Sequence, residues 1–260
     1  MTSPDSLNSA ATALYKALRT GISIAPLTDT YENLTINNAY AISVKLRDMR
    51  LRDGETIIGK KIGVTSKPVM DMLGVNQPDF GFLTDDMWTK NNIIDTSAMI
   101  LPRAEAEIAF KLKADLKGPD VTEEDVIAAT EAVTACFEVV DSRIKDWKVK
   151  IQDTIADNAS CGTMAISSDW VDPNTVDMLG CRAVVTKNGM PLSEGLGAAT
   201  LGSPLKADAW LANTLGSRGI PFKAGEIILS GSLVPLEPVT AGDRMHVKID
   251  GIGACKVDFI

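Results

Sequence analysis

From about residue 91 onward, strand-like segments outnumber the helices that could link parallel strands, and this imbalance limits the possible folds most. A doubly wound parallel sheet needs a helical crossover between most of its strands. After residue 91, helical patterns occur over 123–132, behind a Thr122 cap, and over 204–215. The sequence therefore predicts an α+β fold rather than a doubly wound sheet.

The first ninety residues differ in character from the rest. Helical spacing of apolar residues begins after the cap signal Ser3-Pro4 and ends at Gly21. A second helical stripe, a β-rich run with glycines and a segment punctuated by Asn-Gln-Pro-Asp follow. We therefore predict a smaller N-terminal helical α/β part and a β-rich core. The predicted ranges are 1–90 and 91–260 for the two parts, with helices over 4–20 and 35–52, a strand over 56–66 and a loop over 75–87.

Two patterns define strands and turns in the β-rich core. In "VTACFEVVDSR", Phe137 alternates with Cys136 and Glu138, which predicts a strand with Phe137 on one face and the other two on the opposite face. The dipeptide Asn188-Gly189 lies between strand-like runs and predicts a tight hairpin.

Charge and composition exclude several classes of protein. A net charge of −8, a pI of about 4.8 and the lack of a basic tract exclude nucleic acid as a partner. No apolar run approaches the ~18 residues that span a membrane, and the N-terminus has no secretory signal. Four well-separated cysteines indicate reduced thiols of a cytoplasmic protein. The single histidine, His246, falls on the polar face of a predicted strand, which excludes a Ser-His-Asp site.

The segment "LPRAEAEIAF" places Glu105 and Glu107 two residues apart in an apolar run, so both point to one face of a strand. Adjacent like charges repel each other and glutamate is depleted from strands, so something must offset the cost. Together with Glu138 on a second strand, three carboxylates would form a hard oxygen site for Mg²⁺ or Mn²⁺. The alternative is a solvated strand face on which the glutamates pair with lysines.

Two lysines and an aspartate are candidates for proton transfer. Lys60 and Lys61 lie between isoleucines, where a buried lysine would have a lowered pKa and act as an acid or base. For at least one of them, the pattern favours an ammonium group that reaches solvent. Asp79 is either a general base or a turn residue, and its turn role is the commoner case.

Small polar residues in predicted turns are candidates for ligand binding. Asp157, Asn158 and Ser160 in "TIADNASCG" could orient an anionic ligand. The Ser230-Gly231 turn could bring backbone amides close to a ligand carboxylate. For both segments, an ordinary turn is the alternative.

Five long segments of this chain also occur together in one family: "GKKIGVTSKPVMDMLGVNQPDFGFLTDDM", "PRAEAEIAF", "CFEVVDSRIKDWKVKIQDTIADNASCG", "AWLANTLG" and "GEIILSGSLVPLEPVTAGD". With them, nearly the whole chain resembles the 2-oxopent-4-enoate (2-hydroxypenta-2,4-dienoate) hydratases of bacterial meta-cleavage pathways. These belong to the hydratase–decarboxylase branch of the fumarylacetoacetate-hydrolase-like group. The resemblance implies a mixed β-roll or barrel core with a smaller N-terminal helical α/β part.

The resemblance also implies roles for individual residues, and it favours the metal site over a solvated strand face. Of the two adjacent lysines, the resemblance assigns the catalytic role to Lys61 and not to Lys60. The implied metal ligands are Glu105, Glu107 and Glu138, the implied catalytic residues are Lys61 and Asp79, and the residues implied to border the substrate are Ser160, Ser230 and Gly231.

The implied activity is that of a hydro-lyase, which hydrates 2-hydroxypenta-2,4-dienoate to 4-hydroxy-2-oxopentanoate with Mg²⁺ or Mn²⁺ during aromatic degradation. Protonation at C5, addition of water at C4 and protonation at C3 would complete the reaction. The alternatives are a 2-oxo-3-hexenedioate (4-oxalocrotonate) decarboxylase and a non-catalytic partner subunit of that decarboxylase. The resemblance further implies a homo-oligomer, with decamers frequent in the family, and association with the decarboxylase.

Overall fold

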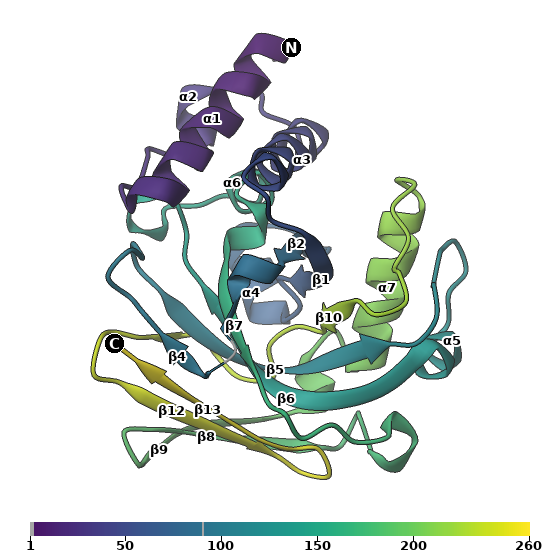
Figure 1. Ribbon diagram of the computed structural model, residues 1–260. Coiled ribbons are helices and arrows are strands. Elements are labelled where there is room, and N and C mark those ends of the chain that lie inside the picture. Colours follow the sequence, from purple (N-terminus) through teal and green to yellow (C-terminus); the bar gives the residue numbers. More distant parts are fainter. Residues whose placement is uncertain (1–2, 90) are drawn as a thin grey trace.

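The protein, described here by a computed structural model over residues 3–89 and 91–260, is built on a strongly curled sheet (Figure 1). Its strands are β1 (Ile57–Gly63), β2 (Asp79–Thr84), β3 (Trp88–Thr89), β5 (Arg103–Leu112), β6 (Thr130–Val140), β7 (Cys161–Ile166), β10 (Ile227–Leu229) and β11 (Glu237–Pro238). They follow the order β2-β1-β10-β5-β6-β7-β3, and β11 pairs with β5. Most pairs are antiparallel, but β1 runs parallel to β10 and β3 parallel to β7.

A second sheet packs against β6 and β7, on the convex side of the first sheet (Figure 1). Its order is β4-β13-β12-β8-β9, with strands β4 (Ile93–Ile94), β8 (Arg182–Lys187), β9 (Met190–Leu196), β12 (Arg244–Ile249) and β13 (Gly253–Phe259). Asn188 and Gly189 join β8 to β9 with φ angles of 54° and 79°, as a two-residue hairpin turn requires. The predicted hairpin is confirmed.

Helices surround the rest of the first sheet. They are α1 (Pro4–Thr20), α2 (Leu27–Thr30), α3 (Ile36–Arg52), α4 (Lys67–Leu73), α5 (Glu123–Ala129), α6 (Ile151–Ala156) and α7 (Pro204–Gly216). The two predicted N-terminal helices are confirmed, and the side chains of Ser3 and Thr35 cap them as expected. Among the described residues, no helix is both long and apolar enough to cross a membrane.

Two predicted segment types need correction. The range 75–87, expected as a loop, contains β2, every residue of which is buried. Gly81 there is not a turn residue: a Cβ atom on it would lie 2.5 Å from the carbonyl oxygen of Asn158, so glycine permits close packing within a strand. The helix expected over 123–132 ends at Ala129, because Thr130 already begins β6.

The two faces of β6 have different surroundings. Phe137 and Val139 point toward the second sheet and join the main hydrophobic core, as the sequence pattern predicts. Cys136 and Glu138 point to the opposite, concave side of the first sheet. The concave side also holds a small apolar cluster with residues from β2, β5, β6, β7 and β10. Buried polar groups on this side therefore lie inside the curl of the sheet.

The predicted division near residue 91 remains a prediction. β1 and β2 come from the first ninety residues, yet β1 pairs with β10 and β10 pairs with β5. The N-terminal part therefore contributes an edge of the same sheet that carries the central strands.

Candidate metal centre and active site

Three glutamates meet on the concave side of the sheet. Glu105 and Glu107 lie on β5, and Glu138 on β6 lies directly opposite Glu105. One carboxylate oxygen from each residue lies within 4.8 Å of the other two. Glu107 and Glu138 are buried and Glu105 is half-buried. The residues that the sequence predicts as metal ligands thus converge.

Lys61 and Asp79 lie beside this cluster, on neighbouring strands. The Nζ atom of Lys61 is 3.2 Å from Oε1 of Glu138. Asp79 lies opposite Gly63 on β1. A Cβ atom added to Gly63 would overlap Oδ1 of Asp79 and would lie 3.4 Å from Nζ of Lys61. Both side chains therefore extend over Gly63, whose lack of a side chain leaves them room. The structure brings all five predicted metal and catalytic residues together.

Several buried oxygens of this cluster have no hydrogen-bond partner. They are Oε1 of Glu107, Oδ1 of Asp79 and both carboxylate oxygens of Glu138, for which the nearby Lys61 is not aligned as a donor. Leaving buried carboxylate oxygens without partners is costly. A hard divalent cation would satisfy such a set, because Mg²⁺ and Mn²⁺ prefer carboxylate oxygens. The residues present therefore fit a bound cation.

The charges in the cluster shift the pKa values of its members. Burial, with repulsion from Glu138, raises the pKa of Glu105 to about 7 and that of Glu107 well above its ordinary value. Burial also raises the pKa of Asp79, against the attraction of Lys61. In the metal-free protein, Glu105 and Glu107 therefore hold protons at pH values where free glutamate is ionised.

The expectation that at least one of the two lysines reaches solvent is wrong, whereas burial lowers the pKa of Lys60 as expected for a buried lysine. Neither reaches solvent, since Lys60 is 3% and Lys61 2% exposed. Burial lowers the pKa of Lys61, but attraction from Glu138 outweighs it, so the pKa lies above, not below, its ordinary value. Lys60 points to the other face of β1 and pairs with Glu226. Of the two, Lys61 is the lysine that faces the glutamates.

The residues predicted to border the substrate make contacts within the protein. The N–H of Gly231 donates to Oε2 of Glu107 at 2.9 Å, so this turn orients a candidate metal ligand. Ser230 donates through its hydroxyl to the carbonyl oxygen of Ile108, and Ser160 donates to Asp157. Their roles toward a substrate remain predictions.

Two neighbours of the site did not stand out in the sequence. Thr154 donates a hydrogen bond to Oδ2 of Asp79 at 3.0 Å. Cys161 lies beside Gly81, and both burial and the Glu138 carboxylate raise the pKa of its thiol. A threonine in a helix and a lone cysteine carry no sequence signal for such positions. His246 lies on β12, in the second sheet, away from these groups.

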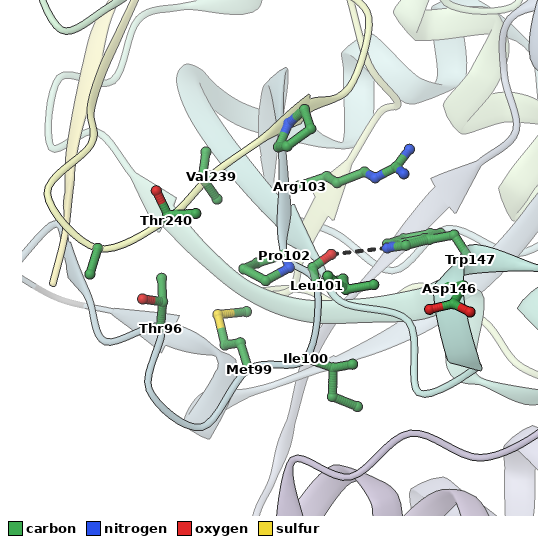
Figure 2. Close-up of a pocket in the computed structure, with 12 residues that line it drawn as sticks. Thr96, Met99, Ile100, Leu101, Pro102, Arg103, Asp146, Trp147, Val239 and Thr240 are labelled. Atoms are coloured by element: carbon green, nitrogen blue, oxygen red, sulfur yellow. Dashed lines mark hydrogen bonds between the residues drawn. The ribbon is translucent and has the colours of Figure 1, made fainter.

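A separate cavity of about 400 Å³ lies at the start of β5 (Figure 2). There the guanidinium of Arg103 lies 4.9 Å from the ring centre of Trp147, whose indole N–H donates to the carbonyl oxygen of Leu101. None of the clustered glutamates lines this cavity. It is therefore distinct from the candidate metal centre.

Comparison with known proteins agrees with this geometry. Residues 85–260 match the family model described as "Fumarylacetoacetate (FAA) hydrolase C-terminal". The chain is 57% identical over 249 residues to a 2-hydroxyhexa-2,4-dienoate hydratase from Comamonas testosteroni, covering 95% of this chain and 94% of that protein. It is 54% identical over 216 residues to a 2-hydroxypent-2,4-dienoate hydratase from Pseudomonas putida, covering 82% and 97%.

Among solved structures, 4-oxalocrotonate decarboxylase from Pseudomonas putida G7, complexed with magnesium and adipate, has the same fold over its whole length. The TM-score is 0.96 at 33% identity, and the match covers 100% of this chain and 99% of the decarboxylase. The predicted α+β fold is thereby confirmed. This chain belongs to the fumarylacetoacetate hydrolase family and, within it, to the group that contains the 2-hydroxydienoate hydratases.

Proposed function

We propose that the protein is a hydro-lyase that hydrates 2-hydroxypenta-2,4-dienoate to 4-hydroxy-2-oxopentanoate in a meta-cleavage pathway. The observation that carries this proposal is the convergence of Glu105, Glu107 and Glu138 around unpartnered buried oxygens, next to Lys61 and Asp79. The hydratases to which the chain is 57% and 54% identical support this substrate class.

Glu105, Glu107 and Glu138 would hold Mg²⁺ or Mn²⁺, which when bound supplies positive charge beside oxygen atoms that become negative during enolate chemistry. Lys61 carries an ammonium group at the edge of this cluster and can pass a proton to the substrate. Asp79, whose pKa is raised by burial, is the second candidate for a proton transfer. Thr154 fixes one oxygen of Asp79 and leaves Oδ1 free for this transfer. Each positioned proton transfer would contribute about 10²–10⁴-fold to the rate.

Decarboxylation of 2-oxo-3-hexenedioate is the second candidate function. The TM-score of 0.96 to 4-oxalocrotonate decarboxylase favours it, and decarboxylation also develops an enolate. The lower identity to that protein, 33% against 57% for a hydratase, places it second.

One experiment separates the two functions. Metal-stripped protein is mixed with 2-hydroxypenta-2,4-dienoate, with and without Mg²⁺, while dienol absorbance is followed and the product is identified by NMR. A parallel sample holds 2-oxo-3-hexenedioate and is monitored for CO₂. We expect Mg²⁺-dependent 4-hydroxy-2-oxopentanoate and no CO₂. Release of CO₂ would make the protein the decarboxylase, and inactivity in both samples would favour a different dienoate or a subunit that depends on its partner.

We also propose that the protein forms a homo-oligomer and associates with the decarboxylase. Size-exclusion chromatography with light scattering tests the first point, and co-elution with purified decarboxylase tests the second. A monomer that does not co-elute would contradict both proposals.

A further inference from the structure

The side chain of Arg143 makes several hydrogen bonds to the segment that connects β6 to β7. Its Nε donates to Oδ1 of Asp157 at 2.6 Å, and its backbone N–H donates to Oδ2 of the same residue at 3.0 Å. Its Nη groups donate to the carbonyl oxygens of Asp141, Cys161 and Asp157. Arg143 is 2% exposed and Asp157 is completely buried. A guanidinium bound in several directions fixes the path of the chain around it.

The turn that follows Asp157 has an unusual backbone. Asn158, Ala159 and Ser160 have φ angles of 56°, 51° and 55°. All three residues are buried, and none is a glycine. Left-handed conformations cost energy for residues with a Cβ atom, so three in succession persist only where the surroundings impose them. The contacts of Arg143 and Asp157 supply that constraint at the start of the turn.

The strained turn presses against β2, the edge strand that carries Asp79. Asn158 accepts a hydrogen bond from the N–H of Phe82 at 2.8 Å and donates one to its carbonyl oxygen at 2.9 Å. The side chain of Asn158 thus replaces a neighbouring strand at this edge. Its own carbonyl oxygen packs against Gly81, which lies opposite Lys61 in the sheet.

The same segment reaches the site at both of its ends. Thr154, before the turn, donates to Asp79, and Cys161, after the turn, lies beside Gly81 and Glu138. The contacts of residues 154–161 therefore span the strand of Asp79 and the edge of the glutamate cluster. The metal ligands themselves lie on β5 and β6, outside this segment.

We propose that Arg143 and Asp157 are positioning residues, whose buried pair holds the strained turn Asn158–Ser160 against β2 and so fixes Asp79 and Lys61 relative to the carboxylate cluster. This inference rests on the proposed hydratase function. Displacement of a reacting group by about 1 Å can cost about 10²-fold in rate. The pair therefore acts on the rate of the chemical step, with little influence on metal binding.

The test variant is Arg143→Lys, which keeps the positive charge but loses the several donors of the guanidinium. The control is Arg182→Lys, because Arg182 forms an exposed ion pair with Glu194 on the second sheet. For Arg143→Lys we expect kcat to fall at least about tenfold, while KM and the Mg²⁺ concentration for half-activation change by less than about threefold. Arg182→Lys should behave as the wild type. Unchanged kcat in a folded Arg143→Lys protein would overturn the proposal.

Hydrogen exchange gives a readout that does not depend on activity. In Arg143→Lys, amides of residues 79–84 should exchange at least about tenfold faster, while those of 244–259 on the second sheet should not change. If the wild type lacks hydratase activity, the proposed function fails, and this exchange pattern still decides whether the pair holds the turn. Equal acceleration in both ranges would indicate a general loss of stability and would contradict a positioning role.

A rescue variant separates positioning from core stability. Glycine adopts left-handed angles without strain, so Ala159→Gly in the Arg143→Lys background should recover at least about threefold in kcat. Recovery of thermal stability without recovery of kcat would count against the proposal. If Arg143→Lys does not fold, Asn158→Asp decides instead, because it replaces the donation to the carbonyl oxygen of Phe82 by a repulsive contact between two oxygens while Oδ1 can still accept from the N–H of Phe82. It should lower kcat and speed exchange in 79–84, and a wild-type result in both would refute the model.

Discussion

Charge balance at the level of single residues favours a cation at the candidate metal centre. Three glutamates face one ammonium group, that of Lys61, in a buried space. Burial and, after it, repulsion from Glu138 raise the pKa values of Glu105 and Glu107. A bound divalent ion would reverse the balance, favouring ionised glutamates and a more acidic lysine.

Glu107→Gln should remove metal-dependent activity without unfolding the protein. The amide oxygen can still accept from Gly231, and the loss of one buried like charge reduces repulsion. Changes outside the ligand shell already cost about 10–100-fold in metal affinity, so we expect at least about 100-fold weaker Mg²⁺ binding. Calorimetric titration and Mg²⁺-dependent Tm measure this. A variant that stays fully active would refute the assignment of Glu107 as a metal ligand.

Lys61→Met should separate catalysis from metal binding. Methionine fills similar space but cannot transfer a proton, so kcat should fall by about 10²–10⁴-fold. Mg²⁺ affinity should be equal or tighter, because the ammonium group 3.2 Å from Glu138 competes with the cation for the same negative charge. Steady-state kinetics and Mg²⁺ titration check both effects, and unaltered kinetics would remove Lys61 from the mechanism.

Metal-free protein should lose stability as the pH rises from about 4.5 to about 7. Glu105 has a folded pKa of about 7 against an ordinary value of 4.5, so in this window the folded state keeps a proton that the unfolded state releases. The folded state therefore binds more protons than the unfolded state, and the free energy of unfolding falls with increasing pH. Tm measured with EDTA at several pH values tests this, with Glu105→Gln as control. A difference between the two proteins that stays constant with pH would contradict the expectation.

At the level of elements, the sequence predicts helices and hairpins better than it predicts β2. Caps at Ser3 and Thr35 and the Asn188-Gly189 turn are local signals, and each is confirmed. In β2, Gly81 resembles a loop signal when read locally. Glycine is needed at position 81 because of a long-range contact with Asn158, and no local sequence pattern indicates that contact.

The same contrast between local signals and long-range contacts applies to the residues of the candidate site. Strand alternation places Glu105 and Glu107 on one face of β5, but choosing a metal site with Glu138 over a solvated strand face needed the family resemblance. Selection of Lys61 over Lys60 needed the family resemblance, because both residues sit in the same apolar run. The hydrogen bond of Thr154 to Asp79 depends on how α6 packs against β2, which spacing along the chain does not reveal.

Gly81→Ala should damage the site more than a matched glycine change elsewhere. A Cβ atom at Gly81 would meet the carbonyl oxygen of Asn158 at 2.5 Å and the Sγ atom of Cys161 at 2.9 Å, so β2 must move away from the turn. We expect kcat to fall by at least about tenfold. Gly189→Ala meets no atom within 4 Å and should cost about 1 kcal/mol through backbone strain alone, with full activity. Kinetics and urea unfolding of both variants check this, and equal effects on kcat would contradict it.

At the scale of the whole molecule, the first sheet crosses the compositional boundary near residue 91. β1 supplies Lys61 and pairs with β10, and the buried ion pair of Lys60 with Glu226 adds a second link. The stacked rings of Tyr40 and Phe80 join α3 to β2. The N-terminal part therefore shares both its sheet and its site with the core.

This shared sheet predicts that the chain unfolds as one cooperative unit. Removal of residues 1–90 would leave β10 without its parallel neighbour and would expose the apolar surface under α3, so the fragment 91–260 should not fold alone. Urea unfolding of the metal-free protein, at one fixed concentration, should give coincident transitions by tryptophan fluorescence and by circular dichroism. Two separate transitions, or a folded 91–260 fragment, would instead support independent domains. Because Lys61 and Asp79 come from the N-terminal part and the glutamates from the core, a single transition would also mean that the site forms only when the whole chain folds.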